Sequence, residues 1–129
     1  MSKEPIIVAG GEPNSIFLEI FFKSLKTNIF KSPLIIIVSK KLLQQQMEKL
    51  NFDFEINDID KKLKDFSKLN NNKINLINVD YDFKKCFEKI TDKSNNYINE
   101  TFETALNIIK QNNFSKFING PVSKKSFLK

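Results

Sequence analysis

The residues best suited to chemistry lie near the C-terminus, in the stretch Phe114–Lys124. A short apolar run there is broken by Asn119–Pro121, which predicts a buried strand ending in a turn, because glycine permits unusual backbone angles and proline cannot donate to a ladder. Ser123 can cap a following helix, and the first-turn amides with Lys124 beside them would favour an anion. The sequence therefore predicts a phosphate or carboxylate site at the carboxyl end of a strand.

Each residue of this candidate site also has a simpler interpretation. Lys124 is either an anion ligand or a solvated lysine, and Gly120 is first of all a turn former. Asn119 can brace the loop through side-chain hydrogen bonds. Glu12, in a loop near the N-terminus, is either a polar group facing the cleft or a carboxylate at a helix N-terminus, where the helix dipole favours it. None of these residues is assigned a catalytic role.

The residues that are missing exclude several classes of enzyme. The chain has no histidine and a single cysteine, Cys86. Neither a structural zinc cluster nor a Ser-His or Cys-His catalytic pair can be assembled from it. The lone cysteine forms no internal disulfide, and we find neither a signal peptide nor an apolar window long enough to span a membrane. These features favour a cytoplasmic protein without a membrane partner.

The net charge of +6 raises the question of nucleic-acid binding. Every cationic residue is lysine and none is arginine, so the bidentate fork that suits guanine and phosphate is missing. The accompanying excess of Asn, Ile and Phe points to a compositional bias of the gene rather than a basic surface selected for binding. A nucleic-acid partner is therefore not expected.

Strand and helix patterns alternate along the chain. The helix predicted over 15–26 carries Ile16, Phe17, Ile20, Phe21 and Leu25 on one face, widened by Leu18 and Phe22. Ser39 should cap the helix predicted over 40–50, and a third helix, which follows residues 94–96 and runs to about 111, should bury Tyr97, Ile98, Phe102, Ala105, Leu106 and Ile109. Strands are predicted over 5–9, 34–38, 52–56 and 73–79, with 52–56 near a sheet edge. This alternation predicts an α/β fold with a mainly parallel sheet.

Residues 1–129 are expected to form a single α/β unit. Within it, residues 58–73 are polar enough to be a mobile insertion, although their apolar spacing also fits a short helix up to Leu69. Asp80 and Asp82 follow the strand predicted over 73–79 and are interpreted as turn residues rather than metal ligands.

Two motifs occur in a fixed order relative to these elements. The first, Gly11–Glu19, has Gly-Glu-Pro, an Ile and a final Glu in common with the family named below. It differs from that family at Ser15, Phe17 and Leu18, where the family has Gly, Gly and Pro. The second is Asn-Gly-Pro-Val-Ser-Lys at 119–124, preceded by the helix around 97–105. Together they resemble the 4-hydroxythreonine-4-phosphate dehydrogenase family. Side chains in place of the two glycines restrict the first loop and close space that a ligand could use.

The resemblance implies an isocitrate/isopropylmalate-dehydrogenase-like fold, incomplete here, in the N-terminal portion of a longer two-domain dehydrogenase. It implies NAD-dependent oxidation and decarboxylation of 4-phosphooxy-threonine, a small phosphorylated amino acid, on the pathway to pyridoxal phosphate. A homodimer and a divalent metal that acts as a Lewis acid are also implied. The family's metal ligands are histidines beyond the Pro-Val-x-Lys loop, so none of them lies in this chain.

Two other interpretations remain open: a phosphate-acyltransferase-like relative on the same α/β plan, and a non-enzymatic α/β binding module. On the dehydrogenase interpretation, the 129 residues alone should not catalyse the reaction, because the metal ligands are absent. Apolar surface is expected to be exposed on the helix that carries Phe17, Phe21 and Phe22.

Overall fold

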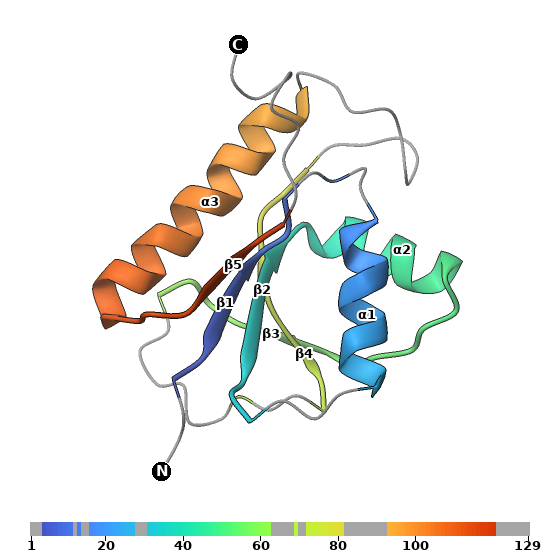
Figure 1. Ribbon diagram of the computed structural model, residues 1–129. Helices are drawn as coiled ribbons and strands as arrows, with labels where there is room; N and C mark the ends of the chain where they lie inside the picture. The colour runs from blue at the N-terminus through green and yellow to red at the C-terminus, as the bar shows by residue number, and fades with distance from the viewer. Residues whose placement is uncertain are drawn as a thin grey trace.

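In the computed structural model, the described strands form one parallel sheet with helices on both faces (Figure 1). Helices α1 and α2 cover one face and α3 covers the other. The structure describes residues 4–11, 13, 16–27, 31–62, 69, 72–81 and 93–120. The sheet order is β3-β4-β2-β1-β5, and the elements are β1 (Ile6–Ala9), α1 (Phe17–Thr27), β2 (Leu34–Val38), α2 (Lys40–Lys49), β3 (Ile56–Asp58), β4 (Ile74–Asn78), α3 (Lys93–Asn112) and β5 (Phe117–Asn119). The predicted α/β fold is confirmed.

Strand β2 lies at the centre of the sheet and of the core. All five of its residues are buried, because a parallel strand with helices on both faces has no solvent-facing side. Its neighbour β4 contains one buried polar residue, Asn75, whose amide donates to Leu34 O at 2.9 Å and accepts from Asn57 Nδ2 at 3.0 Å. The strand predicted over 34–38 is confirmed residue by residue.

Specific polar residues fix the ends of the helices. Ser39 caps α2 as predicted, since its hydroxyl accepts from Leu42 N at 3.2 Å. Asn51 and Asn113 follow α2 and α3 with φ of 60°, and in both places the next residue's N–H bonds to the carbonyl five residues earlier, at 2.9 and 3.0 Å. Asparagine tolerates this left-handed turn, which satisfies the last carbonyls of each helix. Both ends agree with the predicted boundaries.

Helix α1 buries most of the predicted apolar face, but not Ile16 and Ile20. Leu18, Phe21 and Phe22 are buried, whereas Ile16 and Ile20 are 63% and 51% exposed. Phe22 packs on Phe52 and Phe54, with ring centroids 5.3 and 6.2 Å away. The apolar residues cover more than half of the helix circumference, so periodicity alone does not decide which of them are buried, and these tertiary contacts do. Apolar surface is thus exposed at this helix as expected, through Ile20 and the preceding Ile16, while Phe21 and Phe22 are buried.

Two further sequence-based predictions are corrected. Leu106 of α3 is 43% exposed, while Thr101 is buried because its hydroxyl is satisfied by Ile98 O at 2.8 Å. The edge strand begins only at Ile56: Phe52 and Phe54 before it pack against the core, Phe54 N bonds to Met47 Sδ of α2, and only the carbonyl of Glu55 pairs with β4, at Ile74 N. The helix and the insertion predicted within 58–73 lie in part outside the described residues, at 63–68, 70 and 71.

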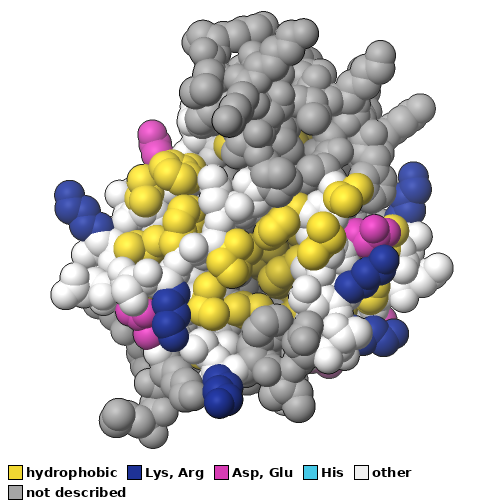
Figure 2. All heavy atoms as spheres, in the orientation of Figure 1, with side chains coloured by type: hydrophobic (Ala, Val, Ile, Leu, Met, Phe, Trp, Pro, Cys, Tyr) yellow, Lys and Arg dark blue, Asp and Glu magenta, His cyan; other side chains and the backbone are white. Residues whose placement is uncertain are grey.

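Hydrophobic side chains gather on one face of the molecule, over β5 and between α3 and α1 (Figure 2). The exposed large hydrophobic residues come from these elements and from the residue before α1: Ile16, Ile20, Leu106 and Ile118. None of the described helices is both long and apolar enough to cross a membrane.

Candidate functional site

Adjacent strands β1 and β5 bring the two sequence motifs to the same edge of the sheet. The strands run parallel, with Ala9 opposite Asn119, and Gly120 N donates to Ala9 O at 2.8 Å. The chain therefore leaves both strands side by side at their carboxyl ends, where α/β proteins place their ligands. Of the predicted site residues, Asn119 is exposed and Gly120 is buried here, while Glu12, Ser123 and Lys124 lie outside the described residues.

All three glycines of the chain meet at this edge. A Cβ added to Gly120 would lie 2.5 Å from Gly10 O and 3.0 Å from Gly11 N. Gly11 adopts a φ of 70°, which disfavours any residue with a side chain. We call Gly10, Gly11 and Gly120 the glycine contact. Gly120 is thus required for the close approach of two backbones, and not only for the predicted turn.

The first loop is also held from the side of α2. Gln46 is fully buried and its Nε2 donates to the carbonyl of Pro13 at 3.3 Å. Sequence reasoning missed Gln46, because a glutamine among lysines and glutamines was taken for the polar face of the helix. The signal was its spacing, since position 46 follows Leu42 by four residues and Leu43 by three and so belongs to the apolar stripe.

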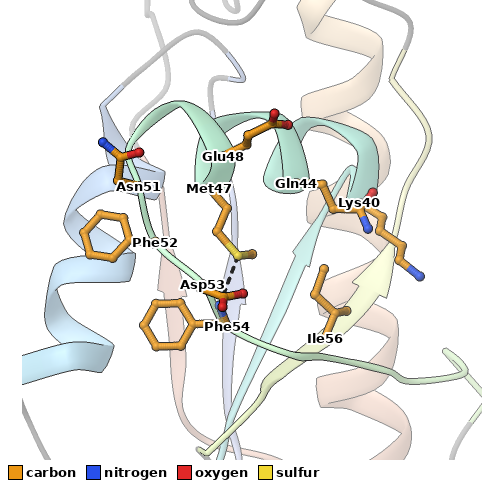
Figure 3. Close-up of a pocket in the computed structure, with 9 residues that line it drawn as sticks. All are labelled: Lys40, Gln44, Met47, Glu48, Asn51, Phe52, Asp53, Phe54 and Ile56. Carbon is orange, nitrogen blue, oxygen red and sulfur yellow. Dashed lines mark hydrogen bonds between the residues drawn. The ribbon is translucent and has the colours of Figure 1, made fainter.

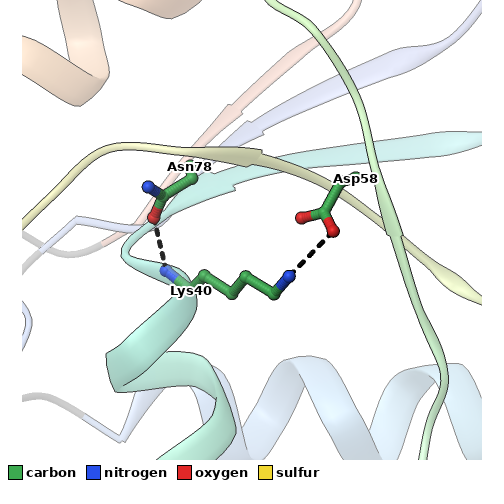
Figure 4. A network of polar contacts seen from close by, with 3 residues as sticks. All are labelled: Lys40, Asp58 and Asn78. Carbon is green, nitrogen blue, oxygen red and sulfur yellow. Dashed lines mark hydrogen bonds and ion pairs between the residues drawn. The ribbon is translucent and has the colours of Figure 1, made fainter.

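A second polar cluster occupies the carboxyl ends of β2, β3 and β4 (Figure 4). Lys40 N donates to Asn78 Oδ1, and Lys40 Nζ pairs with Asp58 Oδ2, both at 2.8 Å. Asn78 in turn donates to Asp80 at 3.0 Å, consistent with a local turn role for this acid. Asp82, its predicted partner in the turn, lies outside the described residues. The groups of this cluster satisfy one another, so it has no surplus charge for an anion.

The N-terminus of α2 is closed from the other face of the sheet by Tyr97 of α3. The N–H of Ser39 donates to the Tyr97 hydroxyl at 2.8 Å, and both residues are buried. Burial raises the pKa of Tyr97 far above its usual value, so the phenol stays neutral. The Tyr81 ring packs beside it at 4.8 Å. The first amides of α2 are therefore used within the protein and do not form a phosphate site.

Replacing Tyr97 with phenylalanine is expected to lower the free energy of unfolding by about 1–3 kcal/mol, because the buried Ser39 N–H loses its acceptor. Urea denaturation measures this change. Thr104→Ala, on the exposed side of the same helix, removes a hydroxyl bonded to Glu100 O and should change stability by less than about 0.5 kcal/mol. Equal losses of stability for the two substitutions would contradict the role of the Tyr97 hydroxyl as the acceptor for the Ser39 N–H.

A cleft of about 720 Å³ lies between α2 and the chain leading into β3 (Figure 3). Met47, Phe54 and Ile56 form its apolar part, and Phe54 N donates to Met47 Sδ at 3.3 Å. Its one lysine, Lys40, is already paired with Asp58. The cleft therefore lacks the unpaired positive charge expected of a phosphate site, and the glycine contact is the better candidate.

The described residues do not fit a divalent metal or a dinucleotide. No group of three or more Asp, Glu, Cys or His side chains comes together among them, and the sequence has no histidine. At the glycine contact, the backbone of Gly10 and Gly11 occupies the space where a Cβ of residue 120 would lie. That space is therefore not open to a cofactor. We therefore derive no reaction step through either group from these residues.

The parallel sheet and its glycine contact define an α/β protein whose candidate ligand site lies at a carboxyl edge. The family model for the pyridoxal phosphate biosynthetic protein PdxA matches residues 30–129, and the chain belongs to this family. A search of curated proteins gave no significant match.

Solved structures show the same fold. A 4-hydroxythreonine-4-phosphate dehydrogenase from Burkholderia phymatum superposes with a TM-score of 0.83 at 14% identity, covering 99% of this chain and 39% of its own. The enzyme of that name from Klebsiella pneumoniae gives 0.80 and 16%, covering 98% and 39%. A putative one from Salmonella typhimurium gives 0.79 and 14%, covering 98% and 40%. The chain thus spans about two fifths of the length of these proteins.

Proposed function

We propose that this chain forms one side of the active site of a dehydrogenase that oxidises and decarboxylates 4-phosphooxy-threonine with NAD, in pyridoxal phosphate biosynthesis. The observation that carries the proposal is the glycine contact, which joins the first loop to the start of the Asn-Gly-Pro-Val-Ser-Lys segment at the sheet's carboxyl edge. That segment lies within the family match, and the solved structures that share the fold bear the dehydrogenase name. The family match favours this function over an acyltransferase-like relative or a binding module.

In this proposal the chain's own residues bind and orient the phosphorylated substrate. Lys124 supplies positive charge for the phosphate, and Ser123 supplies a hydroxyl beside it. Asn119 and Gly120 set the direction in which the segment leaves β5, and Glu12 borders the site from the first loop. NAD and a divalent metal supply hydride acceptance and Lewis acidity in the complete enzyme, which we propose to be a cytoplasmic homodimer.

The isolated 129 residues are proposed to be inactive, because the described part offers no metal site and the chain has no histidine. The reduction of NAD by 4-phosphooxy-threonine and a divalent metal can be followed spectrophotometrically. Metal-dependent turnover by this chain alone would refute its inactivity.

Binding by the chain can be tested separately, because its only glycines lie at the proposed site. Protein labelled with ¹⁵N-glycine gives amide signals for Gly10, Gly11 and Gly120, and titration with O-phospho-L-threonine should shift the Gly120 signal. Lys124→Ala should weaken binding roughly tenfold or more, since a charge-assisted hydrogen bond contributes about 1.5–3 kcal/mol. Lys110→Ala, which removes the same charge from the exposed end of α3, is the control. Equal weakening by both variants would indicate nonspecific charge attraction and contradict the site.

A further inference from the structure

Gln46 is the one polar side chain of α2 that is fully buried. It lies on the apolar stripe of the helix with Leu42, Leu43 and Met47. Its Nε2 donates to Pro13 O, whereas its Oε1 has no hydrogen-bond partner among the described residues. Pro13 O can only accept a hydrogen bond, so the amide nitrogen must face it and the unpaired oxygen must face away.

Such an arrangement does not favour the folded state. A buried acceptor that loses its water without gaining a partner is unfavourable, and an apolar side chain of similar shape would remove that acceptor, although the Pro13 carbonyl would then lose its donor. Methionine is such a side chain, and α2 already carries one at position 47 on the same stripe. The stability of the helix therefore gives no reason for glutamine at position 46.

The contact that Gln46 does make reaches 33 residues back along the chain, to the loop between β1 and α1. That loop is held at two of its described residues, Gly11 and Pro13. The buried Gly11 packs against Gly120, and the buried Pro13 is bonded by Gln46. The two contacts come from different elements, so together they restrict both the position and the direction of the loop.

We propose that Gln46 is a positioning residue that fixes the first loop, through Pro13, at the carboxyl edge of β1. The inference rests on the proposed function only for the identity of the ligand that the loop meets. The fixing of the loop is a property of the chain itself and can be measured without a ligand.

The test uses Gln46→Met in the whole 129-residue chain labelled with ¹⁵N-glycine. Carbonyl ¹³C in alanine identifies Gly10, which follows Ala9, and carbonyl ¹³C in asparagine identifies Gly120, which leaves Gly11 as the third signal. We expect the heteronuclear NOE of Gly11 to fall, while Gly10, bonded to Ile37 O at 3.0 Å within the sheet, keeps its value. The Tm should change little, because the substitution removes the unpaired Gln46 oxygen but also leaves the buried Pro13 carbonyl without its donor.

The control is Leu43→Met, which reshapes another fully buried side chain of α2 without removing a polar group. It should lower the Tm and leave the NOE of Gly11 relative to Gly10 unchanged. An unchanged Gly11 in Gln46→Met, or a parallel loss at Gly10 and Gly11, would overturn the proposal. Gln46→Leu is the second variant, and failure of both Gln46 variants to fold would assign Gln46 to stability instead.

The same samples connect the loop to the ligand. We expect Gln46→Met to weaken binding of O-phospho-L-threonine by roughly three- to thirtyfold, the range for residues that act without touching a ligand. If the wild-type chain binds no O-phospho-L-threonine, the proposed function fails, and the NOE of Gly11 still decides the role of Gln46. If the wild type binds and Gln46→Met binds equally well, the loop does not position the ligand and the inference is wrong.

Discussion

Gly120→Ala is expected to lower the free energy of unfolding by about 3 kcal/mol, at the upper end of the range for overpacking a buried position. The new Cβ would lie 2.5 Å from Gly10 O and 2.7 Å from its carbonyl carbon. Both are backbone atoms, which cannot rotate away as the end of a side chain can. Relief therefore requires β5 to move off β1, which also stretches the 2.8 Å hydrogen bond from Gly120 N to Ala9 O. Urea denaturation measures the loss.

Gly10→Ala is the matched control for this substitution. Its Cβ would lie 3.0 Å from Val38 Cγ2 and 3.3 Å from Ile37 O. The nearest atom is a side-chain methyl, which can give way by a few tenths of an ångström, so we expect a smaller loss, about 1–2 kcal/mol. A loss for Gly10→Ala equal to or larger than that for Gly120→Ala would show that backbone contact is not what requires glycine at position 120.

Phe22→Ala is expected to have the largest effect on stability, about 3–5 kcal/mol. The side chain is fully buried and its ring packs against Phe21, Phe52 and Phe54 at centroid distances of 6.2, 5.3 and 6.2 Å. Phe52 and Phe54 follow α2, so the Phe22 ring also joins α1 to the segment that leads into β3. A loss of this size is a large part of the 5–15 kcal/mol that usually separates folded from unfolded protein. Chemical denaturation should show a lower midpoint.

Ile20→Ala provides the comparison on the same helix. Ile20 is 51% exposed, and alanine favours the helix more than isoleucine does, so the change should stay within about 0.5 kcal/mol. If Ile20→Ala were as destabilising as Phe22→Ala, Ile20 would have to be buried, and the packing described here would be wrong.

The fold could be predicted where the residue types of a segment are compatible with only one kind of secondary structure. The run Leu34–Val38 is β-branched or leucine throughout and ends at Ser39, which is a good cap, so strand and helix start were both predicted correctly. The faces of α1 and α3 could not be predicted as well, because Ile20 and Leu106 sit beside other apolar residues that satisfy the same period. Which of them is buried depends on partners that are distant in the sequence.

The candidate site was predictable in its location but not in its contacts. Alternating strands and helices indicate that Gly11 and Gly120 lie at carboxyl ends of strands. They do not indicate that β5 pairs with β1, and only that pairing brings Gly10, Gly11 and Gly120 together. Gln46 escaped prediction for the same reason, since its partner Pro13 belongs to another element.

The pairing of β5 with β1 also bears on the order in which the protein folds. Ser115, just before β5, binds the carboxylate of Glu4, just before β1, through its N–H at 3.0 Å and its hydroxyl at 2.8 Å, across 111 residues of sequence. Contacts this distant close a large loop and are entropically slow to form, whereas β1 pairs with β2 after a single helix. During synthesis, β1, β2 and β4 are therefore available to pair before β5 has been made. The edge that we propose to meet the ligand therefore forms only after the other four described strands have been made, so a nascent chain can pair most of this sheet before its binding site is present.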